Sequence, residues 1–536
     1  MHKIEEVLMP ENLVSVDTTV TPTVFCYSDT FNVAVPFIDR HIEEGRDDKV
    51  AIRVHGGGTV NYGTLFEHVN KAGNALIDLG CSKGDRVLMV VKDSAEFYYL
   101  FWGAIKAGII PVPLNTLLRA KDYSYMIEDA EATAIIFSPE YTSEVEQALE
   151  KSKHKPKINL STDGSDECLA KQMLSASSNL KAASTTANED CFWLYSSGTT
   201  GGPKGVVHAH KDMVVTSQLY GVGILGLTEE DTCFSAAKLF FAYGLGNAMT
   251  FPLWVGAEAI LFPGPPTPDT CHEIIETYKP TIFYGVPTLY AAQLKSMETN
   301  NPDLSSIRVC TSAGEALPPD LLKRWVNKTG IPLLDGIGTT EILHIFLSNQ
   351  IDNVKPGASG LVVPGYEGKV VDADGNEVPN GETGDLMIKG DSLLKLYWRN
   401  PEKTAAALKG DWMYTGDTYY RDEEGFFFCC GRSDDMLKVG GIWCSPVEIE
   451  NKLVEHPKVL EAAIVGREDD VQLIKPEAFI VLNNSADAGE ELEAELLEHC
   501  KTGLARYKYP RWFNFVEDLP KTATGKIQRF QLRSDQ

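Results

Sequence analysis

The chain has 536 residues, several times the roughly 150 residues of a typical domain, so we expect two or more folded units. Its apolar fraction of 43% and charged fraction of 23% are those of an ordinary globular protein and exclude a disordered or collagen-like chain. The 49 basic and 75 acidic residues give a net charge of −26, which argues against nucleic acid and anionic membrane surfaces as partners.

The cysteines and the N-terminal residues indicate a cytoplasmic protein. The 11 cysteines are scattered without C-x-x-C or paired Cys/His spacing, which favours reduced thiols over disulfides or a zinc site. Residues 1–13 carry several charges and lack the apolar core of a secretory signal. The uncharged stretch 239–257 is about as long as a membrane span, but its glycines and Pro252 favour a buried core helix. We therefore expect no membrane span.

The first two thirds of the chain alternate apolar strand-like runs with amphipathic helical stretches. Strands are expected at 86–91, 109–114, 134–137, 309–313 and 333–335, and helices at 95–107 and 318–329. This alternation indicates βαβ units and a mostly parallel sheet. The predicted fold class is α/β, with a large domain of parallel-rich αβ layers.

The pattern changes after residue 357 to short strands separated by turn signals, which predicts a small antiparallel, β-barrel-like part appended to the core. Residues 446–455 then suggest a helix and residues 461–465 a strand. The polar, glycine-bearing stretch 430–441 predicts a boundary near Arg432. We therefore divide the chain into residues 1–431 and a smaller α+β C-terminal domain, residues 432–536.

Residues 196–205 read SSGTTGGPKG after a predicted strand, and they are the most informative stretch of the chain. Glycines let backbone N–H groups approach an anion, hydroxyls donate hydrogen bonds and Lys204 adds positive charge, so the composition suits a polyphosphate. Pro203 and Gly205 flank the lysine, which excludes a Walker A loop. The G-x-G-x-x-G stretch 221–226 lacks a preceding strand, and we expect a helix-ending turn there.

Four further motifs follow residues 196–205 in a fixed order. They are GIGTTE at 336–341, YTGD at 414–417, GRSDD at 431–435 and PKTATGK at 520–526. With the first motif they resemble the adenylate-forming superfamily of acyl-CoA synthetases, luciferases and peptide-synthetase adenylation domains, over nearly the whole chain. The resemblance implies ATP, Mg²⁺ and coenzyme A as cofactors, attack of a carboxylate on the α-phosphate, and a mobile C-terminal domain.

The resemblance also implies roles for individual residues. Lys526 is the implied catalytic lysine, Thr340 donates to the α-phosphate, and Glu341 helps to bind Mg²⁺. Asp434 is the implied hinge, and Lys438, Gly440 and Gly441 form a loop on the CoA side. Contacts with ATP or AMP are implied for Ser196, Ser197, Gly198, Thr199, Thr200, Lys204, Gly314, Glu315, Ala316, Asp335, Gly336, Ile337, Thr340, Asp417 and Arg432. The Asp417 carboxylate, an acceptor only, suits the two ribose hydroxyls.

By the resemblance, residues 240–244 correspond to the pocket stretch in which amino-acid adenylation domains place an aspartate. They contain no carboxylate to pair an ammonium group, so amino acids are disfavoured as substrates. Residues 342–345 lack the tryptophan of acetate-type enzymes and leave space for a ring, as in the benzoate-CoA ligase branch. The implied pocket is Phe241, Ala242, Tyr243, Gly285, Gly336, Gly338, His344 and Ile345. Medium-chain, branched or alicyclic acids, such as cyclohexane- or cyclohexenecarboxylate, stay open as alternatives. So do a non-catalytic ATP-binding regulator and the choice between monomer and homodimer.

Overall fold

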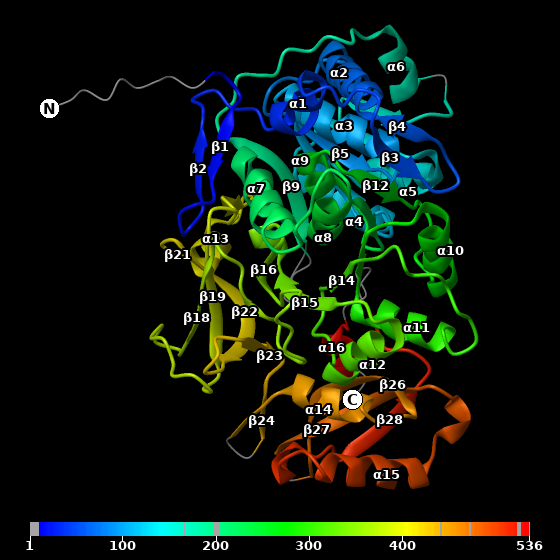
Figure 1. Ribbon diagram of the computed structural model, residues 1–536, viewed down its shortest axis with the longest axis vertical. Coiled ribbons are helices and arrows are strands. Elements are labelled where there is room, and N and C mark those ends of the chain that lie inside the picture. Colours follow the sequence, from blue (N-terminus) through cyan, green and yellow to red (C-terminus); the bar gives the residue numbers. More distant parts are fainter. Residues whose placement is uncertain are drawn as a thin grey trace, which may run out of the picture.

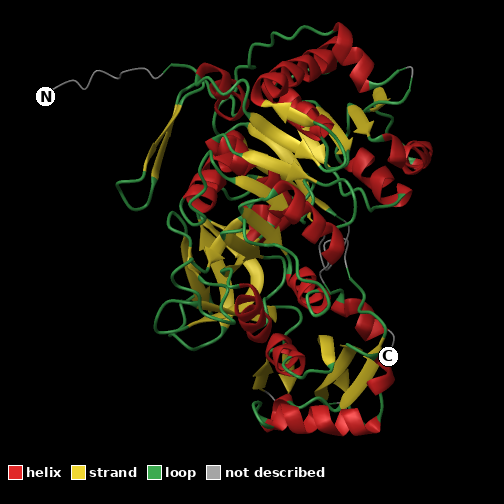
Figure 2. Ribbon diagram, turned by 45° about the vertical axis from the view of Figure 1, so that its right-hand side comes forward, coloured by secondary structure: helices red, strands yellow, loops and turns green. Residues whose placement is uncertain are grey.

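The computed structural model describes residues 10–165, 167–196, 203–439, 442–470, 473–521 and 527–534. Of the predicted site residues, Ser197, Gly198, Thr199, Thr200, Gly440, Gly441 and Lys526 lie outside the described residues. The described chain forms a large body of αβ layers, with a smaller C-terminal unit below it in Figure 1. In Figure 2 the strands of that lower unit lie against one long helix at the bottom.

A four-stranded parallel sheet forms one αβ layer of the body, in the order β6-β5-β7-β8. Its strands are β5 (Arg86–Val90), β6 (Ile110–Pro113), β7 (Ala134–Phe137) and β8 (Ile158–Ser161). The helices that connect or precede them are α2 (Tyr62–Asp78), α3 (Ala95–Lys106), α4 (Ala120–Asp129) and α5 (Thr142–Lys151). Strands β5, β6 and β7 are apolar runs, as expected for parallel strands covered on both faces. The predicted βαβ units are confirmed here.

A nine-stranded sheet forms the second layer, in the order β17-β16-β15-β14-β13-β11-β12-β3-β4. The strands are β3 (Val50–Val54), β4 (Thr59–Asn61), β11 (Thr232–Ser235), β12 (Glu258–Leu261), β13 (Ile282–Gly285), β14 (Val309–Ser312), β15 (Leu333–Gly338), β16 (Ile345–Ser348) and β17 (Leu361–Val362). The strands from β15 to β3 are parallel. Their carboxyl ends share one edge, where ligands of open α/β sheets bind. The associated helices are α10 (Pro268–Tyr278), α11 (Pro287–Ser296) and α12 (Pro319–Thr329).

The uncharged stretch 239–257 is a buried helical run, as predicted. It consists of α8 (Ala242–Leu245), η4 (Gly246–Thr250) and α9 (Phe251–Val255). The run ends at Gly256, whose φ of +81° is the left-handed conformation of a helix C-terminus. No helix among the described residues is long and apolar enough to cross a membrane. The stretch 221–226 ends another helical run, formed by α7 (His210–Thr216) and η3 (Ser217–Val222).

Two antiparallel sheets complete the body. One contains β9 (Asp190–Ser196), β10 (Lys204–Ala209) and β20 (Leu396–Tyr397). The other is the expected appended sheet, with five antiparallel strands β18 (Glu367–Val371), β19 (Gly384–Lys389), β21 (Leu408–Lys409), β22 (Trp412–Arg421) and β23 (Phe427–Arg432). This sheet lies at the left of Figure 1. Helix α13 (Pro401–Ala407) connects β20 to β21.

The C-terminal unit has its own sheets, helices and apolar core. Its elements are β24 (Leu437–Val439), β25 (Ile442–Cys444), α14 (Pro446–Val454), β26 (Val459–Glu468), β27 (Ile474–Leu482), α15 (Glu490–Lys501), β28 (Trp512–Val516) and α16 (Arg529–Ser534). Ile449, Leu453, Ile464, Ile480 and Leu496 are fully buried in one cluster between these elements. The predicted helix 446–455 and strand 461–465 are both present. The division at residue 432 stays a prediction, consistent with β23 ending there.

The remaining elements are short. They are β1 (Val14–Asp17), β2 (Val24–Tyr27), η1 (Val35–Asp39), α1 (Arg40–Glu43), η2 (Pro139–Tyr141), α6 (Leu169–Ser175), η5 (Thr340–Ile342), η6 (Ser485–Asp487) and η7 (Arg506–Lys508). Strands β1 and β2 form a separate hairpin that stands at the side of the body in Figure 2. Of these elements, only η5 carries predicted site residues.

Candidate active site

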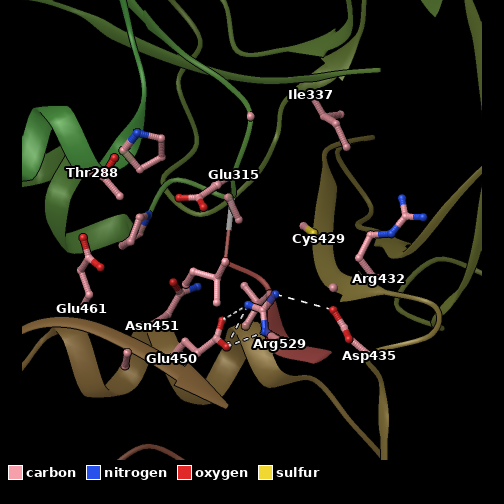
Figure 3. A pocket seen from close by; sticks show the side chains of 18 of the residues that line it. Thr288, Glu315, Ile337, Cys429, Arg432, Asp435, Glu450, Asn451, Glu461 and Arg529 are labelled. Atoms are coloured by element: carbon pink, nitrogen blue, oxygen red, sulfur yellow. Dashed lines mark hydrogen bonds and ion pairs between the residues drawn. The ribbon is translucent and has the colours of Figure 1, made fainter. Parts of the chain in front are cut away.

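A cavity of about 1290 Å³ lies between the large body and the C-terminal unit. Figure 3 shows residues of β15, β23, α14 and α16 around it. The predicted residues that line it are Ser196, Lys204, Phe241, Gly314, Glu315, Ala316, Gly336, Ile337, Gly338, Thr340, Glu341, Asp417, Arg432 and Asp434. Motifs that are separated by more than two hundred residues in the chain therefore meet at one cavity.

Asp417 and Arg432 form one edge of the cavity. They are directly opposite on β22 and β23, and Arg432 Nη1 donates to Asp417 Oδ1 at 3.0 Å and to the Thr415 carbonyl at 3.2 Å. Gly416 has a φ of +76°, and a Cβ there would lie 2.8 Å from Arg432 Nη2. The positive φ favours glycine at this position, and the absence of a side chain leaves room for the guanidinium. A carboxylate has about four lone-pair sites and can accept several hydrogen bonds, so its chemistry suits two hydroxyls.

Thr340 and Glu341 lie on η5, shortly after β15. Hydrogen bonds from residues of other segments hold their main chain. The carbonyls of residues 340, 341 and 342 accept, in that order, from His208 Nε2 at 2.8 Å, Leu394 N at 2.7 Å and Ser392 Oγ at 2.8 Å. The next residue, Leu343, has a φ of +71°, which is unfavourable for a residue with a Cβ. Such a conformation persists where the surroundings determine it, and these three hydrogen bonds supply that constraint.

Lys204 enters the cavity at the start of β10, opposite Ser196 at the end of β9. Its ammonium nitrogen lies 5.5 Å from the ring centroid of Tyr397. The Tyr397 hydroxyl donates to Glu341 Oε1 at 3.0 Å. One tyrosine therefore contacts both the predicted phosphate-binding cation and the predicted metal-binding carboxylate.

The charge state of Lys204 is set by its surroundings. Burial, and then the neighbouring Lys403 ammonium, lower the pKa of Lys204 to about 8. As the pH rises through this value, the free protein loses the ammonium that would face the phosphates. We therefore expect the dissociation constant of a non-hydrolysable ATP analogue to rise as the pH increases from about 7 to about 9.5.

Lys403→Gln tests the cause of this shift. Removing the neighbouring charge should return the pKa of Lys204 toward its ordinary value and move the loss of affinity to higher pH. Isothermal titration at several pH values measures both proteins. An affinity that does not change over this range in the unmodified protein would contradict the prediction.

Asp335 lies in the predicted adenine slot, although it does not line the cavity itself. It is buried, while its neighbours Gly336 and Ile337 face the cavity. The described residues give Asp335 Oδ1 no hydrogen bond. The structure therefore brings Gly336 and Ile337 of the predicted slot to the cavity and places Asp335 behind them.

The predicted ring-pocket residues are brought together behind the glycines of β15. Tyr243 OH contacts the Gly285 carbonyl at 3.3 Å, and the Tyr243 and His344 ring centroids are 5.6 Å apart. A Cβ on Gly336 would lie 3.0 Å from Ile345 Cγ2. Ala242 begins α8 next to this group. The five residues Ala242, Tyr243, Gly285, His344 and Ile345 do not line the large cavity, whereas Phe241, Gly336 and Gly338 do.

His344 is neutral in this environment. Its Nε2 faces two acceptors, the Asn247 Oδ1 at 3.1 Å and the Tyr243 carbonyl at 3.3 Å, so the hydrogen is on Nε2. Burial lowers the pKa of His344 to about 3. The predicted ring pocket is therefore lined by uncharged groups, which suits an aromatic ring and disfavours an ammonium.

The C-terminal unit contributes residues that sequence reasoning did not select. Arg529 Nη2 donates to Glu450 Oε1 at 2.9 Å and to Glu450 Oε2 at 2.8 Å, and Arg529 Nη1 is 3.6 Å from Asp435 Oδ2. Figure 3 shows this network at the lower side of the cavity. The hinge candidate Asp434 is exposed beside it. Lys438 is exposed on β24 and does not line the cavity.

Family models match both parts of the chain. The model described as AMP-binding enzyme matches residues 38–398, and the one described as AMP-binding enzyme C-terminal domain matches residues 448–526. The chain belongs to the AMP-binding enzyme family. The resemblance to the adenylate-forming superfamily that the order of the motifs predicted is thereby confirmed.

Several relatives of this chain are named as CoA ligases of benzoate or of substituted benzoates. The benzoate–CoA ligase of Thauera aromatica is 48% identical, over 97% of this chain and 98% of its own. The 4-hydroxybenzoate–CoA/benzoate–CoA ligase of Rhodopseudomonas palustris is 42% identical, over 94% of each chain. A solved anthranilate CoA ligase, AuaEII with anthranoyl-AMP, superposes with a TM-score of 0.91 at 42% identity, over 95% of this chain and 97% of its own. The solved benzoate CoA ligase of Burkholderia xenovorans superposes with a TM-score of 0.87 at 44% identity. The match covers 94% of this chain and 100% of its own.

The magnesium ion that this family implies fits the residues present. The described residues contain no group of three or more His, Cys, Asp or Glu side chains that could hold a metal. Mg²⁺ commonly binds through one or two carboxylates together with substrate phosphates. Glu341, on the cavity wall with Lys204, is a carboxylate of this kind. The ion would therefore be held between Glu341 and the nucleotide, and would neutralise phosphate charge.

Two residues that position the motif were missed from the sequence. Asp212 Oδ2 lies 2.8 Å from His208 Nδ1, and His208 in turn contacts the Thr340 carbonyl. Both His208 and Asp212 are fully buried. Tyr397 was missed as well, because nothing in its local sequence shows that it faces Glu341. The contacts of His208 with Thr340 and of Tyr397 with Glu341 join residues more than fifty positions apart, and Asp212 acts through His208. No local sequence pattern therefore reveals them.

Proposed function

We propose that this protein is a cytoplasmic, ATP- and Mg²⁺-dependent benzoate–CoA ligase that forms AMP. The benzoate oxygen attacks the α-phosphorus of ATP, and the bond to the β-phosphate bridging oxygen breaks, giving benzoyl-adenylate and pyrophosphate. The thiol sulfur of coenzyme A then attacks the benzoyl carbon, and AMP leaves as the thiol proton is lost to solvent. The products are benzoyl-CoA, AMP and pyrophosphate.

The observation that carries the proposal is the contrast between two adjoining regions. The cavity has charged walls with Lys204, Glu341, Asp417 and Arg432, whereas the adjoining residues around His344 are buried and neutral. The charged region suits a nucleotide, and the neutral region suits a ring without charge. The relatives named as benzoate–CoA ligases support this assignment.

The roles of the residues follow from their chemistry. Lys204 would hold the β- and γ-phosphates, Thr340 would donate to the α-phosphate, and Asp417 with Arg432 would bind the ribose. Lys526 would bridge the substrate carboxylate and the α-phosphate during adenylation. We further propose that the C-terminal domain, residues 432–536, rotates about Asp434 between the two steps and brings Lys438, Gly440 and Gly441 to the CoA side.

The test is a panel of acids scored for AMP release and for CoA thioester. Benzoate should give the highest kcat/KM, followed by ring-substituted benzoates, with cyclohexanecarboxylate, hexanoate and phenylalanine lower. Highest turnover with cyclohexanecarboxylate or hexanoate would support the alicyclic or medium-chain alternative instead. Absence of AMP with every acid would leave a nucleotide-binding regulator as the better account.

A further inference from the structure

Tyr397 occupies a position between two groups of opposite charge. Its hydroxyl donates to Glu341 Oε1 at 3.0 Å, and its ring centroid lies 5.5 Å from the Lys204 ammonium. The side chain is 8% exposed and lines the cavity. The described residues give the other Glu341 oxygen, Oε2, no hydrogen bond. The tyrosine therefore engages one oxygen of the carboxylate.

The backbone of Tyr397 is anchored on both sides. It pairs with Val206 of β10, and its N–H donates to Thr404 Oγ1 at 3.0 Å. The next residue, Trp398, donates from its backbone N–H to the Gly205 carbonyl at 2.8 Å and from its indole to the Asp129 carbonyl at 2.9 Å. These bonds tie the tyrosine to the strand that begins with Lys204. A well-fixed side chain can hold a partner in one geometry at small entropic cost.

The hydroxyl of Tyr397 donates its hydrogen bond to the side chain of Glu341, whereas the other bonds at this motif reach its main chain. The main chain of Glu341 is already held by Leu394, and its neighbour Thr340 by His208. Among the residues that the structure describes, Tyr397 is the one whose hydrogen bond reaches the Glu341 side chain.

Lys204 and Glu341 carry opposite charges, and Tyr397 contacts both. In a partly desolvated cavity, a flexible lysine and a nearby carboxylate gain energy by forming a direct ion pair. Such a pair would occupy the two groups that the nucleotide and its metal need. A tyrosine that binds the carboxylate through its hydroxyl and the ammonium through its ring opposes the formation of this direct ion pair.

We propose that Tyr397 is a positioning residue that keeps Glu341 and Lys204 apart and presents the Glu341 carboxylate to the metal ion of the bound nucleotide. This inference rests on the proposed function only for the use of the metal nucleotide, and not for the identity of the acid. It assigns no chemistry to Tyr397 itself. Its effect is on how the metal is held before any bond is broken.

The test measures metal binding without any acid or turnover. Mn²⁺, a paramagnetic substitute for Mg²⁺, is titrated into protein saturated with a non-hydrolysable ATP analogue, and free Mn²⁺ is read by electron paramagnetic resonance. Tyr397→Phe keeps the ring and removes the hydroxyl. The loss of one hydrogen bond to a carboxylate should weaken Mn²⁺ about 3- to 10-fold. Binding of the analogue without metal should stay as in the unmodified protein.

A second variant separates the two contacts. Tyr397→Leu also removes the ring, so Lys204 can pair with Glu341, and the analogue should now bind more weakly even without metal. Tyr123→Phe is the matched control, because it too removes a buried tyrosine hydroxyl, one that donates to the Asn115 carbonyl at 2.8 Å away from the cavity. This control should bind Mn²⁺ normally.

A double variant decides whether Tyr397 acts through Glu341. Glu341→Gln alone should weaken Mn²⁺ strongly, and adding Tyr397→Phe should weaken it no further, since the hydroxyl has lost the partner through which it acts. Additive losses, unchanged Mn²⁺ binding in Tyr397→Phe, or equal weakening of the metal-free analogue would overturn the proposal. Because no acid is present, these results stand even if the panel of acids rejects benzoate.

Discussion

Lys526→Ala should lower the rate of adenylate formation by about 10²–10³-fold or more, because charge develops on the α-phosphate with no ammonium beside it. The same variant should convert supplied benzoyl-adenylate and coenzyme A to product at the normal rate. The reason is that the C-terminal domain would have carried the lysine away from the site before the second step. Pyrophosphate release measures the first step, and thioester formation from synthetic adenylate measures the second.

Lys521→Ala is the matched control for this variant. Lys521 belongs to the same motif, but its ammonium is 2.7 Å from Glu461 and 3.0 Å from Asp518, both within the C-terminal unit. Removing it deletes the same charge without removing the catalytic group, so both half-reactions should continue. Equal losses of Lys526→Ala in the two half-reactions would show that the domain does not rotate between them.

The second large effect is expected at the ring pocket. Ala242→Leu adds three carbon atoms beside Tyr243 at the start of α8 and should exclude substituted benzoates by overpacking. Ile345→Ala should have the opposite effect and admit bulkier acids. Changes of a few methylenes in an apolar pocket shift discrimination by roughly 10- to 200-fold in relative kcat/KM. The measurement is kcat/KM for benzoate, a substituted benzoate, cyclohexanecarboxylate and hexanoate.

Ala405→Leu is the control for the added volume, because Ala405 lies exposed on α13. It should leave the ranking of the four acids unchanged. The KM for ATP should change little in all three variants, since the nucleotide is assigned to other residues. If the ranking stays the same in Ala242→Leu and Ile345→Ala while the KM for ATP moves, the ring has been assigned to the wrong residues.

Much of the fold could be predicted because the pattern is local. The run 86–91 is apolar after Arg86 and became β5, and the periodicity of 95–107 became α3. Strand β15 extends three residues beyond the predicted 333–335, to Gly338. The extension pairs with β16. Glycine weakens strand propensity in a sequence, but here Gly336 and Gly338 are needed where β16 and the His344 carbonyl approach closely.

The candidate site could be predicted in part, for a similar reason. Lys204, Glu341 and Asp417 stand in ordered motifs, so resemblance to a family selected them. Tyr397 and Arg529 act through partners that are 56 and 79 residues away, at Glu341 and Glu450. Only tertiary packing creates those contacts, so one sequence taken alone does not reveal them.

The bonds of Arg529 connect three parts of the C-terminal unit. Arg529 joins α16 to α14 through Glu450, and to the residue after the proposed hinge through Asp435. If the unit turns at Asp434 as proposed, α16 would therefore turn together with α14 and Asp435. Holding reacting groups in a fixed geometry raises their effective molarity, so a unit whose helices turn together favours reaction more than one whose helices move independently. In this proposal, the change from adenylate formation to thioester formation would then depend on the backbone rotation at Asp434.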